Sequence, residues 1–242
     1  SGERRWATPR IGLCVFSHVT PYVTQLDGVD QVVILANEHG QKDPAALISA
    51  VDVRTGGVLW QTRTWQRYNM PIPQPVKVDK DKLLIAGGYT IGAFVLRAWR
   101  EGPDWKTDFI VRTQNAHPHL HSPALWKDRL YLQSFDRYHQ RSQHGLVCLT
   151  PDAQLKWRSG PNIDFDSGGL LAADDLVFVM NGRTGELSLV EATDEEFREL
   201  ARAKVLDAEE GEVWAPLALS RGRLLVRDLT TLKCLDVSAA RK

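Results

Sequence analysis

Three histidines alternate with other residues near the middle of the chain, at His117, His119 and His121. On an extended strand this spacing places all three imidazoles on one face, and neutral imidazoles are good metal ligands. Asp164 and Asp166, further along the chain, can add carboxylate oxygens, and a mixed His and Asp set suits zinc, manganese or another divalent metal. The alternative is a polar, solvated loop, because prolines beside these histidines interrupt the alternation.

The acidic residues also fit hydrolytic chemistry. Asp164 or Asp166 together with Glu212 can supply a general acid and a general base, which in glycoside hydrolases lie about 5–10 Å apart. Phosphate-binding and acyl-transfer chemistry have no support. The pairs Gly56-Gly57 and Gly87-Gly88 do not open a helix with nucleotide-loop spacing, and no serine has a nucleophile-elbow context.

Composition places the chain among ordinary globular proteins. Its 242 residues carry 30 Lys and Arg against 30 Asp and Glu, and 43% of them are apolar. A net charge of zero argues against nucleic acid or an anionic membrane surface as the main partner. No apolar run approaches the ~18 residues of a spanning helix, and no export signal is visible in the segment Ser1–Arg5 and the residues behind it.

The three cysteines, Cys14, Cys148 and Cys234, lie far apart in the sequence. No zinc-binding spacing exists among them. We expect all three to be small buried apolar residues, and a Cys148–Cys234 disulfide stays open.

A repeated pattern runs through the chain: a small residue or proline, an apolar pair, a polar turn and an alternating apolar strand. Its marker, a proline or an equivalent glycine, falls at positions 21, 75, 123, 169 and 216. The spacings between markers are therefore 54, 48, 46 and 47 residues. A four-stranded propeller blade takes ~40–50 residues, so the period fits blades better than helical repeats.

Each unit contains short β-branched or aromatic runs bounded by turn residues. Second strands are predicted at Val32–Leu35, Leu83–Ala86, Leu130–Leu132, Leu176–Met180 and Leu224–Val226. Third strands are predicted at Leu47–Val53, Gly92–Ala98, Gly145–Leu149, Glu186–Glu191 and Leu232–Val237. Fourth strands are predicted in four units, at Val58–Arg63, Lys106–Val111, Leu155–Arg158 and Arg198–Val205. A capping box predicts one helical turn at Thr193–Phe197.

We therefore predict an all-β fold: a β-propeller of about five four-stranded blades in a single domain over residues 1–242. The predicted blade units are residues 17–63, 71–112, 117–159, 164–206, and 213–242 together with 1–9.

The clearest copy of the repeat lies in the first unit, where Ala50, Asp52, Gly56 and Trp60 are regularly spaced. The Asp side chain can bond the backbone of a tight turn, the Gly tolerates positive φ, and the Trp can fill the gap against the next blade. A weaker copy ends at Trp157. The pattern A-x-D-x-x-x-G-x-x-x-W resembles the repeat of the pyrroloquinoline-quinone-like (quinoprotein-like) β-propellers.

The two ends of the chain carry complementary halves of this motif. Residues Gly2–Trp6 match its end, and Cys234 with Asp236 matches its beginning, with Asp236 aligned on Asp52. We expect the N-terminal strand to complete the C-terminal blade, as closed propellers do to protect their edge strands. The family usually has seven or eight blades, so a closed five-bladed ring and part of a larger propeller both stay open.

The resemblance implies several functional expectations. Quinone-dependent members of the family stack their cofactor between a Trp and a disulfide of adjacent cysteines, beside a Ca²⁺ ion. No two cysteines are adjacent here, so we expect no quinone cofactor and no dehydrogenase activity. Members with degenerate repeats include scaffolds without a cofactor, and the family is largely extracytoplasmic, which implies a periplasmic or extracellular location.

In a propeller, the loop before the first strand of each blade lies at the mouth of the central channel, where binding residues gather. We expect a non-enzymatic module that binds a protein or a small polar or carbohydrate ligand there, without a cofactor. A metal-dependent or glycosidase-like enzyme is the alternative. The predicted channel-mouth residues are His18, Tyr68, Asn69, His117, His119, His121, Asp164, Asp166, Glu212 and Trp214, and the predicted structural residues are Asp52, Gly56, Trp60, Trp157 and Trp6.

Overall fold

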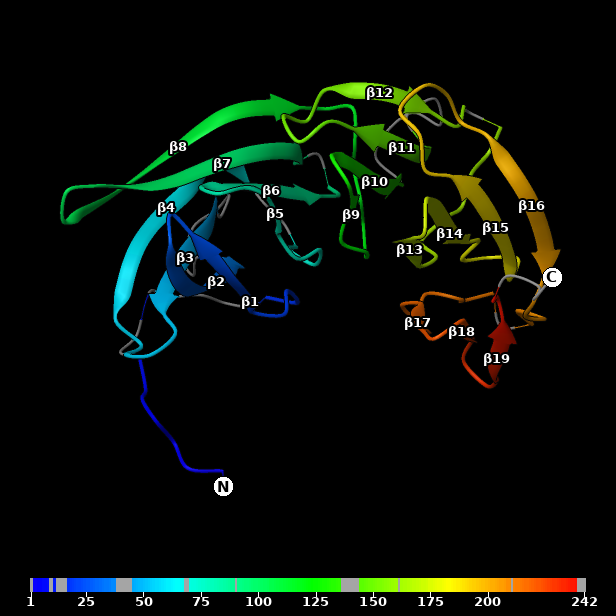
Figure 1. Cartoon of the computed structure of the whole chain (residues 1–242), viewed down its shortest axis with the longest axis horizontal. Helices are drawn as coiled ribbons and strands as arrows, with labels where there is room; N and C mark the ends of the chain where they lie inside the picture. Colours follow the sequence, from blue (N-terminus) through cyan, green and yellow to red (C-terminus); the bar gives the residue numbers. More distant parts are fainter. Residues whose placement is uncertain are drawn as a thin grey trace.

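The computed structural model describes residues 2–8, 11, 17–37, 45–67, 70–89, 91–135, 144–160, 162–209 and 211–238. Within these residues all regular structure is β, in five antiparallel sheets without a helix. The sheets follow one another along an open arc, with the first strand of each sheet on the inside and the last on the outside (Figure 1). The predicted all-β, blade-based fold is confirmed.

We number the sheets as blades in chain order. Blade 1 comprises β1 (Tyr22–Leu26), β2 (Val29–Asn37), β3 (Ala45–Asp52) and β4 (Val58–Arg67). Blade 2 comprises β5 (Val76–Asp79), β6 (Lys82–Gly87), β7 (Gly92–Glu101) and β8 (Asp104–Thr113). Blade 3 comprises β9 (Ala124–Trp126), β10 (Arg129–Ser134), β11 (Gly145–Leu149) and β12 (Leu155–Arg158). Blade 4 comprises β13 (Leu170–Ala173), β14 (Leu176–Met180), β15 (Glu186–Glu191) and β16 (Glu199–Lys204), and in the described chain blade 5 has β17 (Ala218–Ser220), β18 (Arg223–Arg227) and β19 (Leu232–Asp236).

Every strand pairs with its neighbour in sequence, so each blade is a meander. The first hairpin of each blade has a two-residue loop, at 27–28, 80–81, 127–128, 174–175 and 221–222. In three of these loops both residues have positive φ, as in Asp27-Gly28 and Arg221-Gly222. This conformation matches the twist of the flanking strands, and it places the second strand of each blade where the sequence predicts it.

The third and fourth strands of every complete blade share a β-bulge at the same place. The register shifts immediately after Ala50, Val95, Cys148 and Leu189. We call the fourth-strand residue paired with the residue before the bulge the bulge-partner position. Its occupants in blades 1 to 4 are Trp60, Val111, Trp157 and Ala201.

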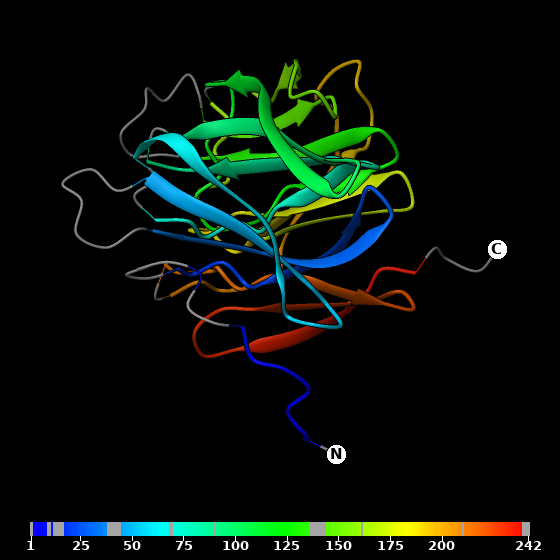
Figure 2. The same ribbon diagram turned by 90° about the vertical axis from the view of Figure 1, so that its left-hand side faces the viewer.

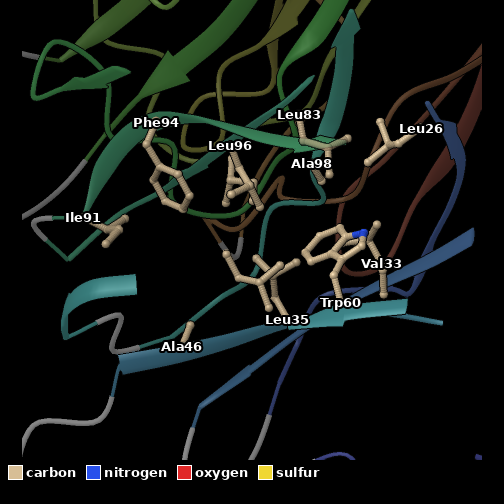
Figure 3. Packing of buried hydrophobic residues seen from close by; sticks show 13 residues of the cluster. Leu26, Val33, Leu35, Ala46, Trp60, Leu83, Ile91, Phe94, Leu96 and Ala98 are labelled. Atoms are coloured by element: carbon tan, nitrogen blue, oxygen red, sulfur yellow. The ribbon is translucent and has the colours of Figure 1, made fainter. Parts of the chain in front are cut away.

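Apolar clusters fill the spaces between successive blades. Trp60 lies between blades 1 and 2, only 5% exposed, in a cluster that includes Val33 of its own blade and Leu83 and Ala98 of blade 2 (Figure 3). Its indole Nε1 donates a 2.7 Å hydrogen bond to Oε1 of Gln31. The predicted burial of Trp60 between neighbouring blades is confirmed.

The turn that precedes Trp60 has the predicted structure. Oδ1 of Asp52 accepts hydrogen bonds from the backbone N–H groups of Arg54 and Thr55, each at 2.8 Å. These bonds lower the pKa of the Asp52 carboxyl, the bond from Thr55 most strongly. Gly56 has a φ of 71°, and a Cβ placed there would lie 2.5 Å from the Trp6 ring. Glycine is therefore required at this position by both backbone conformation and space.

The expected ring closure is not confirmed in the described residues. The indole Nε1 of Trp6 donates a 2.8 Å hydrogen bond to the carbonyl oxygen of Val53, and Oγ1 of Thr8 donates one to Gly56. The N-terminal residues 2–8 form no strand, and their run away from the sheets is visible in Figure 2. In the described chain β19 therefore has no fourth strand beside it, although Trp6 contacts the turn after β3 of blade 1 as Trp157 contacts the loop after β15 of blade 4.

Two smaller expectations are also wrong. Residues Thr193–Phe197 form an irregular loop in place of a helical turn. Cys148 is a free buried thiol, as expected, whereas Cys234 is free and exposed on blade 5, so the expectation that Cys234 is buried is wrong and the disulfide that the sequence left open is not formed. Cys14 lies outside the described residues. No helix of the described chain is long and apolar enough to cross a membrane.

Candidate functional site

The three predicted histidine ligands lie in a loop. Residues 114–123 connect β8 to β9 without regular structure, which suits Pro118 because proline cannot donate to a strand ladder. The expectation that one strand face carries His117, His119 and His121 is therefore wrong.

Two of these imidazoles have neighbours of their own. His117 is fully buried, and its Nε2 lies 2.8 Å from the carbonyl oxygen of Gln114. His119 Nε2 lies 2.8 Å from the hydroxyl of Tyr89, and the two rings are in edge contact. In the described part of the chain, no three His, Cys, Asp or Glu side chains are grouped as a metal site requires.

His121 lies nearer the centre of the arc. Its Nε2 is 3.2 Å from the carbonyl oxygen of Ser167 in the segment before blade 4. Burial lowers the pKa of this imidazole, and hydrogen bonds to the backbone of Ser167 and Trp214 oppose that shift in part. His121 is therefore neutral at neutral pH.

The two candidate aspartates lie in the same segment as Ser167, before β13, but their side chains have other partners. Oδ2 of Asp164 is 3.4 Å from Nδ1 of His144, and its Oδ1 accepts the backbone N–H of Asp166 at 2.9 Å. Asp166 forms an ion pair with Arg183 at 2.8 Å. Asp164 lines a cavity of about 270 Å³ that is separate from the one beside His121. The structure thus does not bring these aspartates together with the histidine loop.

Glu212 and Trp214 are close in sequence but line different cavities. Glu212 borders a small acidic depression of about 110 Å³ between the loops of blades 4 and 5. Trp214 is 42% exposed and borders the cavity beside His121. The expected acid and base are therefore not assembled in one cavity. Tyr68 and Asn69 lie outside the described residues.

One cavity of about 490 Å³ collects residues from all five blades, and we call it the central pocket. Nearly all of its lining comes from the segments that immediately precede the first strands. Its lining residues are His18, Thr20, Ile72, Gln74, Leu120, His121, Ser122, Leu170, Trp214 and Pro216. Three of the ten predicted channel-mouth residues, His18, His121 and Trp214, are thus brought together here.

Hydrogen bonds between neighbouring blades fix the segments around this pocket. The backbone N–H of His18 donates to the carbonyl oxygen of Pro71 at 3.1 Å. Gln74 donates through its backbone to Oγ of Ser122 at 2.7 Å and through its side chain to the carbonyl of Thr20 at 3.2 Å. Blades 1, 2 and 3 are therefore tied together at the pocket wall, and His121 continues these ties to blade 4.

The chemistry of the central pocket is that of a polar recognition surface with apolar parts. Its described lining contains hydroxyl, amide and imidazole groups beside apolar side chains, and within those residues no Asp, Glu, Lys, Arg or Cys. Such a pocket can form directional hydrogen bonds and stack on an aromatic face.

Sequence reasoning missed several lining residues because it searched for titratable groups. Thr20, Gln74 and Ser122 each stand one position before the repeat markers at 21, 75 and 123. The repeat itself therefore carried the signal: the same position in successive units reaches the same central space.

The blades, their meander topology and the shared central pocket define an all-β protein of β-propeller architecture. No family model and no curated protein sequence matches the chain. Among solved structures, BamB from Moraxella catarrhalis is similar at 13% sequence identity and a TM-score of 0.38, over 87% of this chain and 80% of BamB.

Proposed function

We propose that the chain is a non-enzymatic binding module that holds a neutral polar ligand of carbohydrate type in the central pocket. The observation that carries this proposal is the lining of that pocket: all five blades contribute to it, and among the described residues none contributes a carboxylate, an ammonium, a guanidinium or a thiol. His18 and His121 line the pocket, but no such group of the described lining stands beside them to act with an imidazole as a nucleophile or as the second partner of an acid–base pair.

The composition of the wall favours a sugar among neutral ligands. Trp214 presents an exposed ring, and an indole face packs well against an apolar C–H face while its surroundings stay polar. Thr20, Gln74 and Ser122 line the wall as hydroxyl and amide residues. A volume of about 490 Å³ lies within the ~300–1,000 Å³ range of small-molecule sites.

The proposal includes an extracytoplasmic location and the absence of a quinone cofactor. The resemblance of the Asp52–Trp60 repeat to quinoprotein-like propellers supports the location. The wide spacing of the cysteines supports the absence of the stacked quinone.

The test is isothermal titration of neutral trisaccharides of glucose and of N-acetylglucosamine into the wild type and two variants. Trp214→Ala is expected to weaken binding at least tenfold, because the stacking surface is lost. Trp214→Phe keeps an aromatic face and is expected to retain most of the affinity. Binding that ignores Trp214, or no binding at millimolar sugar, would overturn the ligand class.

The same samples test the non-enzymatic part of the proposal. Chromogenic glycosides, and alcohols or aldoses with pyrroloquinoline quinone and Ca²⁺, are expected to show no turnover above buffer. Turnover that is lost in Asp164→Asn or Glu212→Gln would identify an enzyme.

A further inference from the structure

Blade 4 differs from blades 1 and 3 at the bulge-partner position. Trp60 in blade 1 and Trp157 in blade 3 are 5% and 6% exposed, each buried against the next blade. The corresponding residue of blade 4 is Ala201, which pairs with Leu189 just before the bulge. A methyl group thus stands where blades 1 and 3 place an indole ring and blade 2 places Val111.

An apolar pocket occupies the space that this alanine leaves between blades 4 and 5. It has a volume of about 300 Å³, and we call it the indole slot. Its lining residues are Leu176, Phe178, Leu187, Leu189, Ala201, Arg202, Ala203, Val237 and Ser238. Ala201 and Ala203 are exposed, so the slot opens to solvent at the outer strand β16.

The slot also contains the counterpart of the polar group that binds the Trp157 indole. Nε1 of Trp157 donates a 2.8 Å hydrogen bond to the carbonyl oxygen of Thr193 in the next blade. Thr193 follows Glu191, the register equivalent of Asp52, by two residues, as Ser238 follows Asp236. Asp236 and Asp52 correspond because each accepts the backbone N–H two residues on. The matching carbonyl for an indole in blade 4 is therefore that of Ser238, which lines the slot.

We propose that the indole slot binds a tryptophan side chain presented by a partner polypeptide. The two filled interfaces show which ring this register accommodates, and the interface of blades 3 and 4 shows a backbone acceptor for its N–H. An apolar cavity of only ~150 Å³ suffices to bind benzene, so about 300 Å³ has room for a bicyclic ring. The slot shares no lining residue with the central pocket, so this inference is independent of the proposed function.

The position of the slot beside an edge strand also suits a polypeptide ligand. It opens beside β16, the outer edge strand of blade 4, and Arg202 at its rim is held by Glu199 at 2.8 Å. An extended segment lying along this edge can insert one aromatic side chain and pair its backbone with the strand, which is a common mode of peptide recognition.

The first experiment uses N-acetyl-L-tryptophanamide as a mimic of a tryptophan residue within a chain. Ligand-observed NMR titration of the wild type is expected to show saturable binding at micromolar to millimolar concentration. N-acetyl-L-leucinamide is expected to bind at least tenfold more weakly, because it fills less of the slot and has no indole N–H. Equal binding of the two amides, or none of the first, would overturn the proposal.

Matched variants locate the site. Ala201→Trp places the indole in the slot from inside the chain and is expected to weaken binding of N-acetyl-L-tryptophanamide at least tenfold. Leu200→Trp adds the same ring one position earlier, at an exposed residue that is not among those lining the slot, and it is expected to bind as the wild type does. Undiminished binding to a folded Ala201→Trp variant would contradict the assignment.

Two further measurements keep the test decisive. Ala203→Leu blocks the slot with a smaller change, so loss of binding there supports the site even if Ala201→Trp fails to fold. Free indole tests the source of the ring: binding of indole without binding of N-acetyl-L-tryptophanamide would show a small-molecule pocket and exclude the polypeptide partner.

Discussion

The interface between blades 3 and 4 and the interface between blades 4 and 5 present the same bulge on their first blade and differ in what fills them. In the first, Trp157 is buried and its indole is bonded to Thr193. In the second, Ala201 leaves an open apolar pocket of about 300 Å³. The bulge and the strand register are the same in both blades. The bulge-partner side chain therefore varies on a constant backbone pattern, and beside Ala201, where the described part of blade 5 has three strands, the interface contains an open pocket.

The ion pairs also differ between these two interfaces. Asp194 of blade 4 is reached from blade 3 by Arg129 at 2.6 Å and by Lys156 at 3.2 Å. Across the next interface, an ion pair joins Lys233 to Asp207 at 3.9 Å, with the Asp207 side chain 75% exposed. The shorter ion pairs and the filled apolar site occur at the same interface. We therefore expect the contact between blades 3 and 4 to be more stable than the contact between blades 4 and 5.

The largest expected effect comes from converting the filled interface into the open type. Trp157→Ala is expected to lower the free energy of unfolding by about 3–5 kcal/mol, the usual range for emptying a large buried aromatic site. Denaturant titration followed by circular dichroism measures this loss. Millimolar indole is expected to raise the melting temperature of Trp157→Ala more than that of the wild type.

Trp157→Phe is the matched control, because it keeps a ring and loses only part of the volume and the indole N–H. It is expected to cost less than Trp157→Ala. If the alanine variant loses under about 1 kcal/mol, below the range for a buried large-to-small change, the interface does not depend on its tryptophan.

A smaller, pH-dependent effect on stability is expected at the ion pairs between blades 3 and 4. Hydrogen bonds from Arg129 and then Lys156 lower the pKa of the Asp194 carboxyl. The stabilisation from this group is therefore fully present above its unfolded pKa of about 4 and is lost as the pH falls through the lower folded value. Asp194→Asn is expected to lower the melting temperature at pH 7, and the difference from wild type should shrink below pH 4.

A melting-temperature difference that is constant from pH 7 to pH 3 would show that Asp194 acts through packing and not through its charge. Added salt is a second check, since both partners are partly exposed and screening weakens such contacts.

The smallest effect is expected at the exposed pair of the open interface. Asp207→Asn should leave the melting temperature within about 1 °C of wild type, because surface ion pairs contribute roughly 0–1 kcal/mol. A larger loss than that of Asp194→Asn would reverse the ranking of the two interfaces.

Much of the fold follows from the sequence because its determinants are local. The markers at 21, 75, 123, 169 and 216 and the runs after them report turns and alternating burial within single hairpins. Leu155–Arg158, Leu176–Met180 and Glu186–Glu191 are strands with the bounds that the pattern predicts. The Asp52 turn and the burial of Trp60 follow from a motif whose parts contact one another.

The features that the sequence does not predict depend on choices between distant partners. Gly2–Trp6 resembles the end of a repeat and Trp6 contacts the turn of blade 1, yet residues 2–8 form no strand beside β19. The histidine loop predicts ligands by composition, but the direction of each imidazole depends on neighbours such as Tyr89 and Ser167. The indole slot cannot be predicted from the sequence, because only the strand register of the structure aligns Ala201 with Trp157.

The strictly sequential strand pairing of the blades has a consequence for synthesis on the ribosome. Each complete blade takes all four strands from one contiguous stretch of chain, so none has to wait for a distant segment before its hydrogen bonds close. Contacts between sequence neighbours form quickly, and domains made of such units can fold from the N-terminus as they emerge. Once folded, blade 1 can thus provide the apolar surface against which blade 2 packs. The growing chain then exposes the apolar face of one incomplete blade at a time.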